Sequence, residues 1–178
     1  MQRYVAFLRG MNLGGRRITN EDLCGHVRAL GFGEVSAVLA SGNVLFSAER
    51  SSMKQVAKRL EQGLSQALAY DVPAFVRTST QVQAVAGFQP FDAEMGEDGG
   101  KLQVALFSHK PSAAAQARAM ACATNADLLC IHGTELYWLP RGKLTESDLD
   151  VKVIDAALGP MTMRTRRTIE RIAARLTA

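Results

Sequence analysis

The chain has 178 residues, of which 47% are hydrophobic and 21% charged, a composition typical of a soluble globular protein with one domain or two small ones. No apolar run approaches the roughly 18 residues of a membrane-spanning helix, and the first residues lack a signal-peptide pattern, which predicts a cytoplasmic protein without membrane contact. The formal net charge is +4, and residues 159–178 alone carry five Arg and one Glu, so the basic character is confined to the C-terminal segment.

The first half of the chain predicts elements in the order βαββαβ. The apolar run at residues 4–8 is typical of a buried strand, and Leu23, Val27 and Leu30 recur at helical spacing behind the capping residues 19–22. We expect two strands flanking a turn at 35–39 and 44–46, followed by an amphipathic helix at 53–68. A fourth strand at 74–77 and a short additional helix at 80–86 complete the first half.

The second half repeats this order of elements. Strands are expected over 102–107, 128–132, 135–139 and 161–164, helices over 112–123 and 147–158, and a last helix carries Ile169, Ile172, Ala173 and Leu176 on one face. Thr145 and Asp148 resemble a capping pair for the helix over 147–158.

The predicted fold class is α+β, with two tandem ferredoxin-like βαββαβ subdomains whose antiparallel sheets carry helices on one face. We expect an N-terminal subdomain at 1–91, an acidic Gly-rich linker at 92–100 and a C-terminal subdomain at 101–178. The acidic residues of the linker are expected to be solvated rather than to hold a metal ion.

The loop after the first strand has the sequence RGMNLGG at residues 9–15 and combines a cation with glycines. Because glycine tolerates positive φ and lets backbone N–H groups converge, Arg9, Asn12 and the amides of Gly14 and Gly15 are candidate ligands for an anion. Two Arg residues then replace the Lys and Ser/Thr of a P-loop, which argues against a nucleotide hydrolase. A tight turn between strand and helix is the alternative interpretation of the same glycines.

A second turn, Ser41-Gly42-Asn43, has side chains that either donate to a ligand or close the turn onto their own backbone, and both interpretations stay open. The first and third strands of a βαββαβ unit are antiparallel neighbours. From this we expect the turn at the opposite end of the sheet from the first loop, so that the two form one site only if the chain closes over a sheet edge.

Arginine residues form a stripe on the expected C-terminal helix if that helix extends back to residue 164. The arginine residues of this stripe lie opposite the apolar face and are Arg164, Arg167, Arg171 and Arg175. Such a stripe tracks phosphates in nucleic-acid-binding proteins and is equally typical of an ordinary solvated helix face. No string of aromatic residues for stacking bases accompanies it.

No other constellation of residues indicates a specific chemistry. Three Cys and three His are scattered without the spacing of a zinc site or a disulfide framework, so we expect no metal and no cofactor. No GxSxG elbow and no acid–base pair stands out, so the catalytic residues of any reaction are unknown.

Several segments resemble a bacterial family known as domain of unknown function 1697. Members typically begin YVALLRGINVGG and carry an SGNVVF-like segment, matched here by YVAFLRGMNLGG at 4–15 and SGNVLF at 41–46. The strand KLQVALF at 101–107 and the segment from Leu136-Tyr137 to Gly142-Lys143-Leu144 extend the resemblance along nearly the whole chain. The resemblance implies the two-subdomain α+β fold and supplies no reaction, because the family is uncharacterised.

The chain departs from the family pattern near its C-terminus. The usual T-x-R-N-W-N-T stretch is TMRTRRT at 162–168, which keeps the first Thr, the Arg and the last Thr but lacks both Asn and the Trp. The usual Asn-Pro-Phe is Gln89-Pro90-Phe91, and Gly142 replaces a Ser before Lys143. A ligand that depends on the missing side chains would be bound differently here or not at all.

We therefore expect an uncharacterised protein that binds a small anionic or phosphorylated ligand at the loop after the first strand. The candidate ligand-binding residues, two of them from the second half, are Arg9, Asn12, Gly14, Gly15, Ser41, Asn43, Lys143 and Arg164. A nucleic-acid-binding module using the C-terminal Arg stripe is the alternative, and an enzyme of unknown reaction is the third hypothesis. The sequence predicts no particular oligomeric state.

Overall fold

The computed structural model describes residues 1–11, 15, 17–39, 42–92 and 100–177. The chain forms two compact units, one made of Met1–Gln83 with Ile172–Ala178 and the other of Ala84–Arg171, and each is described by itself. Most of the predicted linker, residues 93–99, lies outside the described residues.

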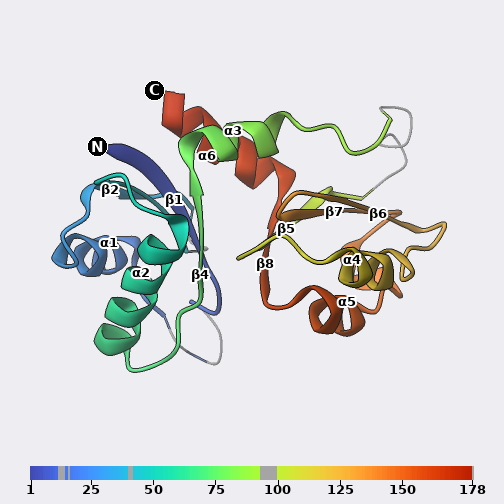
Figure 1. Cartoon of the computed structure of the whole chain (residues 1–178), viewed down its shortest axis with the longest axis horizontal. Coiled ribbons are helices and arrows are strands. Elements are labelled where there is room, and N and C mark those ends of the chain that lie inside the picture. The colour runs from blue at the N-terminus through green and yellow to red at the C-terminus, as the bar shows by residue number, and fades with distance from the viewer. Residues whose placement is uncertain (12–14, 16, 40–41, 93–99, 178) are drawn as a thin grey trace. The chain divides into compact units, whose positions relative to one another are not determined.

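The first unit is built on a four-stranded antiparallel sheet with two helices on one face (Figure 1). Its elements in chain order are β1 (Gln2–Leu8), α1 (Asn20–Ala29), β2 (Gly33–Ala37), β3 (Asn43–Ala48), α2 (Met53–Leu68) and β4 (Ala74–Thr78). The strand order β2-β3-β1-β4 places β1 and β3 at the centre, as a βαββαβ unit requires.

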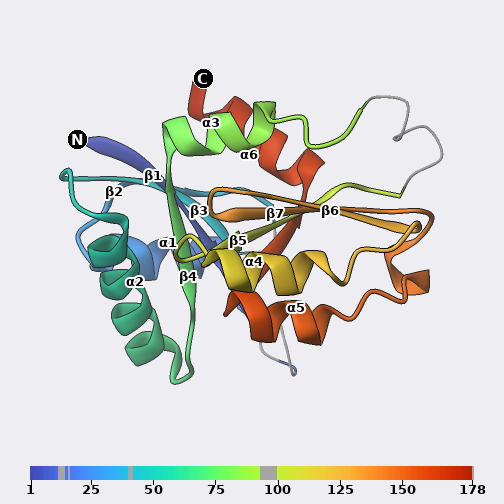
Figure 2. The same ribbon diagram turned by 45° about the vertical axis from the view of Figure 1, so that its right-hand side comes forward.

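The second unit has the same topology, with strand order β6-β7-β5-β8 and two helices packed on one face of the sheet (Figure 2). Its elements are β5 (Gln103–Phe107), α4 (Ala113–Met120), β6 (Asp127–His132), β7 (Glu135–Pro140), a 3₁₀ helix (Leu144–Glu146), α5 (Val151–Leu158) and β8 (Met161–Thr165). The predicted fold class, α+β with two tandem ferredoxin-like subdomains, is confirmed.

The core of the first unit lies between its sheet and its two helices. α2 begins at a capping box in which Ser52 and Gln55 satisfy each other's backbone N–H groups. Side chains spaced by four residues then face the sheet, and the buried ones are Val56, Leu60 and Leu64. Their burial contributes on the order of 5–9 kcal/mol of hydrophobic free energy before the entropy of ordering the chain is subtracted.

One further helix follows the last strand of each sheet, α3 (Ser79–Gly87) after β4 and α6 (Arg166–Thr177) after β8. The side-chain oxygen of Thr165 accepts a hydrogen bond from the N–H of Thr168 at 3.2 Å, which caps α6 at its first residue. Arg164 therefore lies on β8, and the predicted extension of the helical Arg stripe back to Arg164 is wrong.

α5 begins later than the sequence predicts. Asp150 is its N-cap, and the carboxylate accepts hydrogen bonds from two backbone N–H groups of the first turn, both at 3.1 Å. The predicted capping pair of Thr145 and Asp148 is therefore wrong. Asp150 takes this place because it stands directly before the buried stripe of the helix and reaches two free N–H groups at once.

A buried carboxylate ties the segment before α5 to the β6–β7 hairpin. Asp127 is 2% exposed and accepts hydrogen bonds from Trp138 Nε1 at 2.8 Å and Ser147 Oγ at 2.7 Å. The hydroxyl of Thr124 donates to the same carboxylate at 3.3 Å, and Ser147 Oγ accepts from the N–H of Leu149 at 3.0 Å. The network thus fixes the entry to α5 through hydrogen bonds to a charged group, which are the stronger kind.

Candidate functional site

Three connecting segments meet at the end of the first sheet where β1 finishes. β1 and β3 are antiparallel, so the end of β1 lies beside the start of β3. The N–H of Leu8 donates to Gly42 O at 2.8 Å, and the N–H of Arg9 donates to Pro73 O at 3.0 Å. The β1–α1 loop, the β2–β3 turn and the α2–β4 connection are therefore held together; we call this place the loop end of the first unit.

The expectation that the first loop and the Ser-Gly-Asn turn lie at opposite ends of the sheet is wrong. In an antiparallel pair, the chain leaving one strand is next to the chain entering its neighbour. The loop that leaves β1 and the turn that enters β3 consequently share an end without any closure over a sheet edge.

Both the backbone conformation and the packing around Gly42 require glycine at this position. Its φ is +69°, and a Cβ at this position would lie 2.8 Å from Met11 Cγ and 3.2 Å from Leu8 Cβ. Met11 is itself buried, so the first loop is anchored on the β2–β3 turn. Gly10 and Gly15 have φ values of +77° and +82° with no atom within 4 Å of an added Cβ, so there glycine supplies the backbone path alone.

The first loop presents positive charge to solvent. Arg9 and Arg17 are exposed, and Gly15 is exposed between them. Within the described part of the chain, Arg17 has no ion-pair partner. Three of the predicted ligand-binding residues lie outside the described residues, namely Asn12, Gly14 and Ser41.

The start of α1 is already neutralised by its own carboxylates. Thr19 Oγ1 accepts a hydrogen bond from the N–H of Asp22 at 3.1 Å, and the Thr19 hydroxyl donates to the Asp22 carboxylate at 2.7 Å. Glu21 adds a second acidic side chain to the first turn. Because these carboxylates occupy the positive end of the helix dipole, the candidate anion site is the preceding loop rather than the helix.

Asn43 is fully buried at the start of β3. Its Nδ2 donates to Val38 O at 2.9 Å, and the N–H of Val38 donates to Asn43 O at 2.9 Å. The side chain therefore closes the β2–β3 turn, which is one of the two interpretations left open by the sequence. Its contact with a ligand stays a prediction.

The two remaining candidates belong to the second unit. Lys143 follows β7 and pairs with Glu146 at 3.3 Å, with 80% and 61% of the side chains exposed, so the pair contributes little to stability. Arg164 donates to Thr162 Oγ1 and to Met163 O, both at 2.8 Å. Burial lowers the pKa of the Arg164 guanidinium to about 10, so it stays a cation at neutral pH. That these residues share a cleft with Arg9 stays a prediction.

The structure adds Arg77, a buried cation that the sequence analysis missed. Val5 is opposite Arg77 in the first sheet, and Val104 is opposite Arg164 in the second, so the two arginines occupy equivalent positions. The sequence signal is a short internal repeat, VRTSTQV at 76–82 and MRTRRTI at 163–169. In both copies the Thr after the Arg accepts a hydrogen bond from the N–H three residues later, at 3.2 Å.

The outer face of α6 is basic along the helix. Its apolar face is buried through Ile169, Ile172 and Leu176. The arginines on the opposite face are all exposed, namely Arg167, Arg171 and Arg175. Without Arg164, this is a three-residue stripe on a single helix.

The thiols of the chain are free. Burial raises the pKa of the Cys24 thiol against smaller opposing effects of the Arg28 charge and a backbone hydrogen bond, and burial also raises that of Cys130. Among the described residues, no group of three or more His, Cys, Asp or Glu side chains could hold a metal ion. The described helices are also too short or too polar to cross a membrane.

Comparisons with known proteins agree with the fold and name a family. A solved structure of the conserved bacterial protein SP0830 from Streptococcus pneumoniae is similar over 100% of this chain and 99% of that chain, with a TM-score of 0.78 and 18% sequence identity. At that identity the likeness concerns the fold alone. No curated protein matches the chain. A family model described as "Protein of unknown function (DUF1697)" matches residues 1–137, and the chain therefore belongs to the DUF1697 family.

Proposed function

We propose that the protein binds a small anionic or phosphorylated ligand at the loop end of the first unit. The observation that carries the proposal is the length of the three connections that meet there. The β1–α1, β2–β3 and α2–β4 connections span residues 9–19, 38–42 and 69–73, whereas their counterparts in the second unit span 108–112, 133–134 and 159–160. Each connection in the first unit is therefore longer, with eleven against five residues in the first case and five against two in the others.

The second unit shows that this topology closes with short connections at the equivalent end of its sheet. The additional residues of the first unit are thus not needed to join its strands and helices. Loops that exceed the need of the fold and gather at one place on a rigid sheet are typical of binding sites. The hydrogen bonds from Leu8 and Arg9 to the two neighbouring segments hold the base of these loops together.

The chemistry available at this place suits an anion. The exposed guanidinium groups of Arg9 and Arg17 offer paired N–H donors that match phosphate oxygens, and they do so without the cost of burying a charge. Gly10 and Gly15 both have a positive φ, a backbone conformation that recurs in turns whose N–H groups converge on an anion. Acidic side chains occupy the nearest helix start and disfavour an anion there, which supports the loop as the proposed site.

Calorimetric titration with inorganic phosphate and pyrophosphate tests the proposal. We expect binding that falls roughly tenfold on Arg9→Ala and on Arg17→Ala, because each loses a charge-assisted hydrogen bond of at least about 1.4 kcal/mol. Arg50→Ala is the matched control, since it removes an exposed arginine after the far end of β3. Absence of binding, or an equal loss on Arg50→Ala, would overturn the proposal.

A second candidate function, nucleic-acid binding, is supported by the exposed arginine stripe of α6. Such binding falls steeply with salt because cations on the protein displace counterions from phosphates. We expect retention on heparin and single-stranded DNA that is lost when three residues are changed to Glu, namely Arg167, Arg171 and Arg175. Retention that is unchanged by this triple substitution would refute the candidate.

A further inference from the structure

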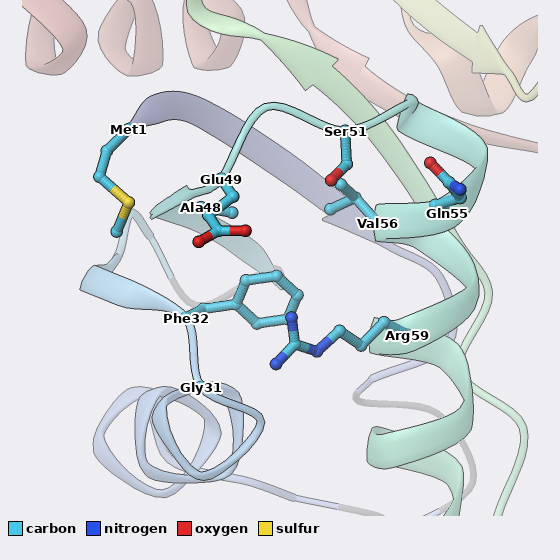
Figure 3. Close-up of a pocket in the computed structure, with 9 residues that line it drawn as sticks. All are labelled: Met1, Gly31, Phe32, Ala48, Glu49, Ser51, Gln55, Val56 and Arg59. Carbon is cyan, nitrogen blue, oxygen red and sulfur yellow. The ribbon is translucent and has the colours of Figure 1, made fainter.

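A cavity of about 610 Å³ lies in the first unit, at the opposite end of the sheet from the loop end. The pairing of Gln2 with Ala48 places the start of β1 beside the end of β3 there. Figure 3 shows the side chains of Phe32, Ala48 and Val56 lining the apolar part of the cavity, with polar groups around them. The cavity is formed by the segment before β2, the segment after β3 and the first turns of α2.

The cavity contains a cation that is fixed in position before any ligand binds. The guanidinium carbon of Arg59 lies 4.7 Å from the centre of the Phe32 ring, and its Nη2 donates to Leu30 O. A Cβ at Gly31, where φ is +81°, would lie 2.9 Å from that Nη2, so glycine makes room for the arginine. The other N–H groups of Arg59 have no hydrogen-bond partner among the described residues.

A carboxylate of the opposite sign lines the same cavity. In Figure 3 the Phe32 ring lies between the Glu49 carboxylate and the Arg59 guanidinium. Within the described residues, neither charge has an ion-pair partner. The hydroxyl of Ser51 points into the space between Glu49 and Val56, and no described residue bonds to it.

We propose that this cavity binds a small zwitterion with an apolar body, a free amino acid or a short peptide. Its carboxylate would accept hydrogen bonds from Arg59, its ammonium group would donate to Glu49, and its apolar part would cover Phe32 and Val56. Two opposite charges across an apolar surface complement such a ligand, whereas a simple anion or a simple cation would be repelled by one of them. This site is separate from the proposed anion site and does not depend on it.

Ligands that share one apolar side chain and differ in charge make the proposal testable by calorimetry or ligand-observed NMR. The probes are leucine, the dipeptide alanyl-leucine, N-acetyl-leucine without its ammonium group and leucinamide without its carboxylate. We expect leucine or the dipeptide to bind at millimolar concentration, and the tighter of the two identifies the source of the zwitterion. Removal of either charge should weaken binding roughly tenfold.

Substitutions in the protein should reproduce the effect of the capped ligands. Glu49→Gln should weaken the zwitterion roughly tenfold without weakening N-acetyl-leucine, because the variant no longer repels this anion. Arg59→Gln should weaken the zwitterion roughly tenfold without weakening leucinamide, because the variant no longer repels this cation. Lys58→Gln is the control, because it removes an exposed cation next to Arg59 that does not line the cavity. The proposal is overturned if no probe binds, if the capped ligands bind as well as the zwitterion, or if Lys58→Gln acts like Arg59→Gln.

Discussion

Replacing Gly42 by Ala tests the contact that holds the first loop on the β2–β3 turn. A positive φ costs a residue with a Cβ about 1–2 kcal/mol, and the stiffer unfolded chain offsets about 0.4–1 kcal/mol of that. The new methyl group would also lie 2.8 Å from Met11 Cγ and 3.2 Å from Leu8 Cβ, and overpacking of this kind adds about 1–3 kcal/mol. We expect the free energy of unfolding to fall by about 3 kcal/mol in total.

Gly15→Ala isolates the backbone part of this cost. Gly15 has a φ of +82°, and an added Cβ would meet no atom within 4 Å. Its substitution should therefore lower the free energy of unfolding by only about 1 kcal/mol. The difference between the two variants, about 2 kcal/mol, is the steric contribution of the contact with the first loop.

Two measurements check the reasoning. Urea unfolding followed by far-UV circular dichroism gives the loss of stability in each variant, and amide hydrogen exchange reports on the N–H of Leu8, which donates to Gly42 O. Exchange at Leu8 should accelerate in Gly42→Ala and not in Gly15→Ala. Equal destabilisation of the two variants, or unchanged exchange at Leu8, would show that the loop and the turn do not pack as described.

Three further predictions concern stability and reactivity. Asp127→Ala deprives a buried indole N–H of its acceptor and should lower the free energy of unfolding by about 3–5 kcal/mol, measured by urea unfolding with tryptophan fluorescence. The exposed Asp148→Ala is the control and should cost under about 0.5 kcal/mol. A similar loss in both variants would contradict the network. Arg166→Ala removes three hydrogen bonds to acceptors at the end of α3 and should cost about 2–4 kcal/mol, unlike exposed Arg167→Ala, by the same unfolding measurement. Burial raises the pKa of the Cys24 thiol, so at about pH 8 iodoacetamide should alkylate Cys24 more slowly than free cysteine, and the rate should increase as the pH rises. Mass spectrometry measures the rate of alkylation. Equal rates for Cys24 and free cysteine at about pH 8 would refute the prediction.

The sequence predicted the elements of the fold because its local signals agree with one another. The apolar run at 4–8 is buried at every residue and lies within β1, as a continuous apolar run predicts. Ser52 begins α2 as its spacing indicates, and Gly133 turns the β6–β7 hairpin with a φ of +63°. These predictions depend on neighbours along the chain, which a single sequence displays.

The errors arose where the answer depends on residues far apart in sequence. The loop and the turn at the loop end are about thirty residues apart, and only the antiparallel register of β1 and β3 brings them together. The contact of Arg59 with Phe32 has the same character, since it needs α2 to lie beside the segment before β2. No periodicity in the sequence reports such a contact, so the cavity could not be predicted.

The internal repeat separates residues that build the fold from those that distinguish the two units. Arg77 and Arg164 recur at equivalent register positions, each followed by a Thr that caps the next helix, so this motif is explained by the topology that both units share. A ligand specific to one unit must be recognised by what the other unit lacks. Only the first unit has the long β1–α1 loop with its glycine and arginine residues. The equivalent β5–α4 connection of the second unit joins the same two kinds of element with fewer residues. The anion site is therefore sought in the loop rather than at the buried arginines, although these carry the same charge.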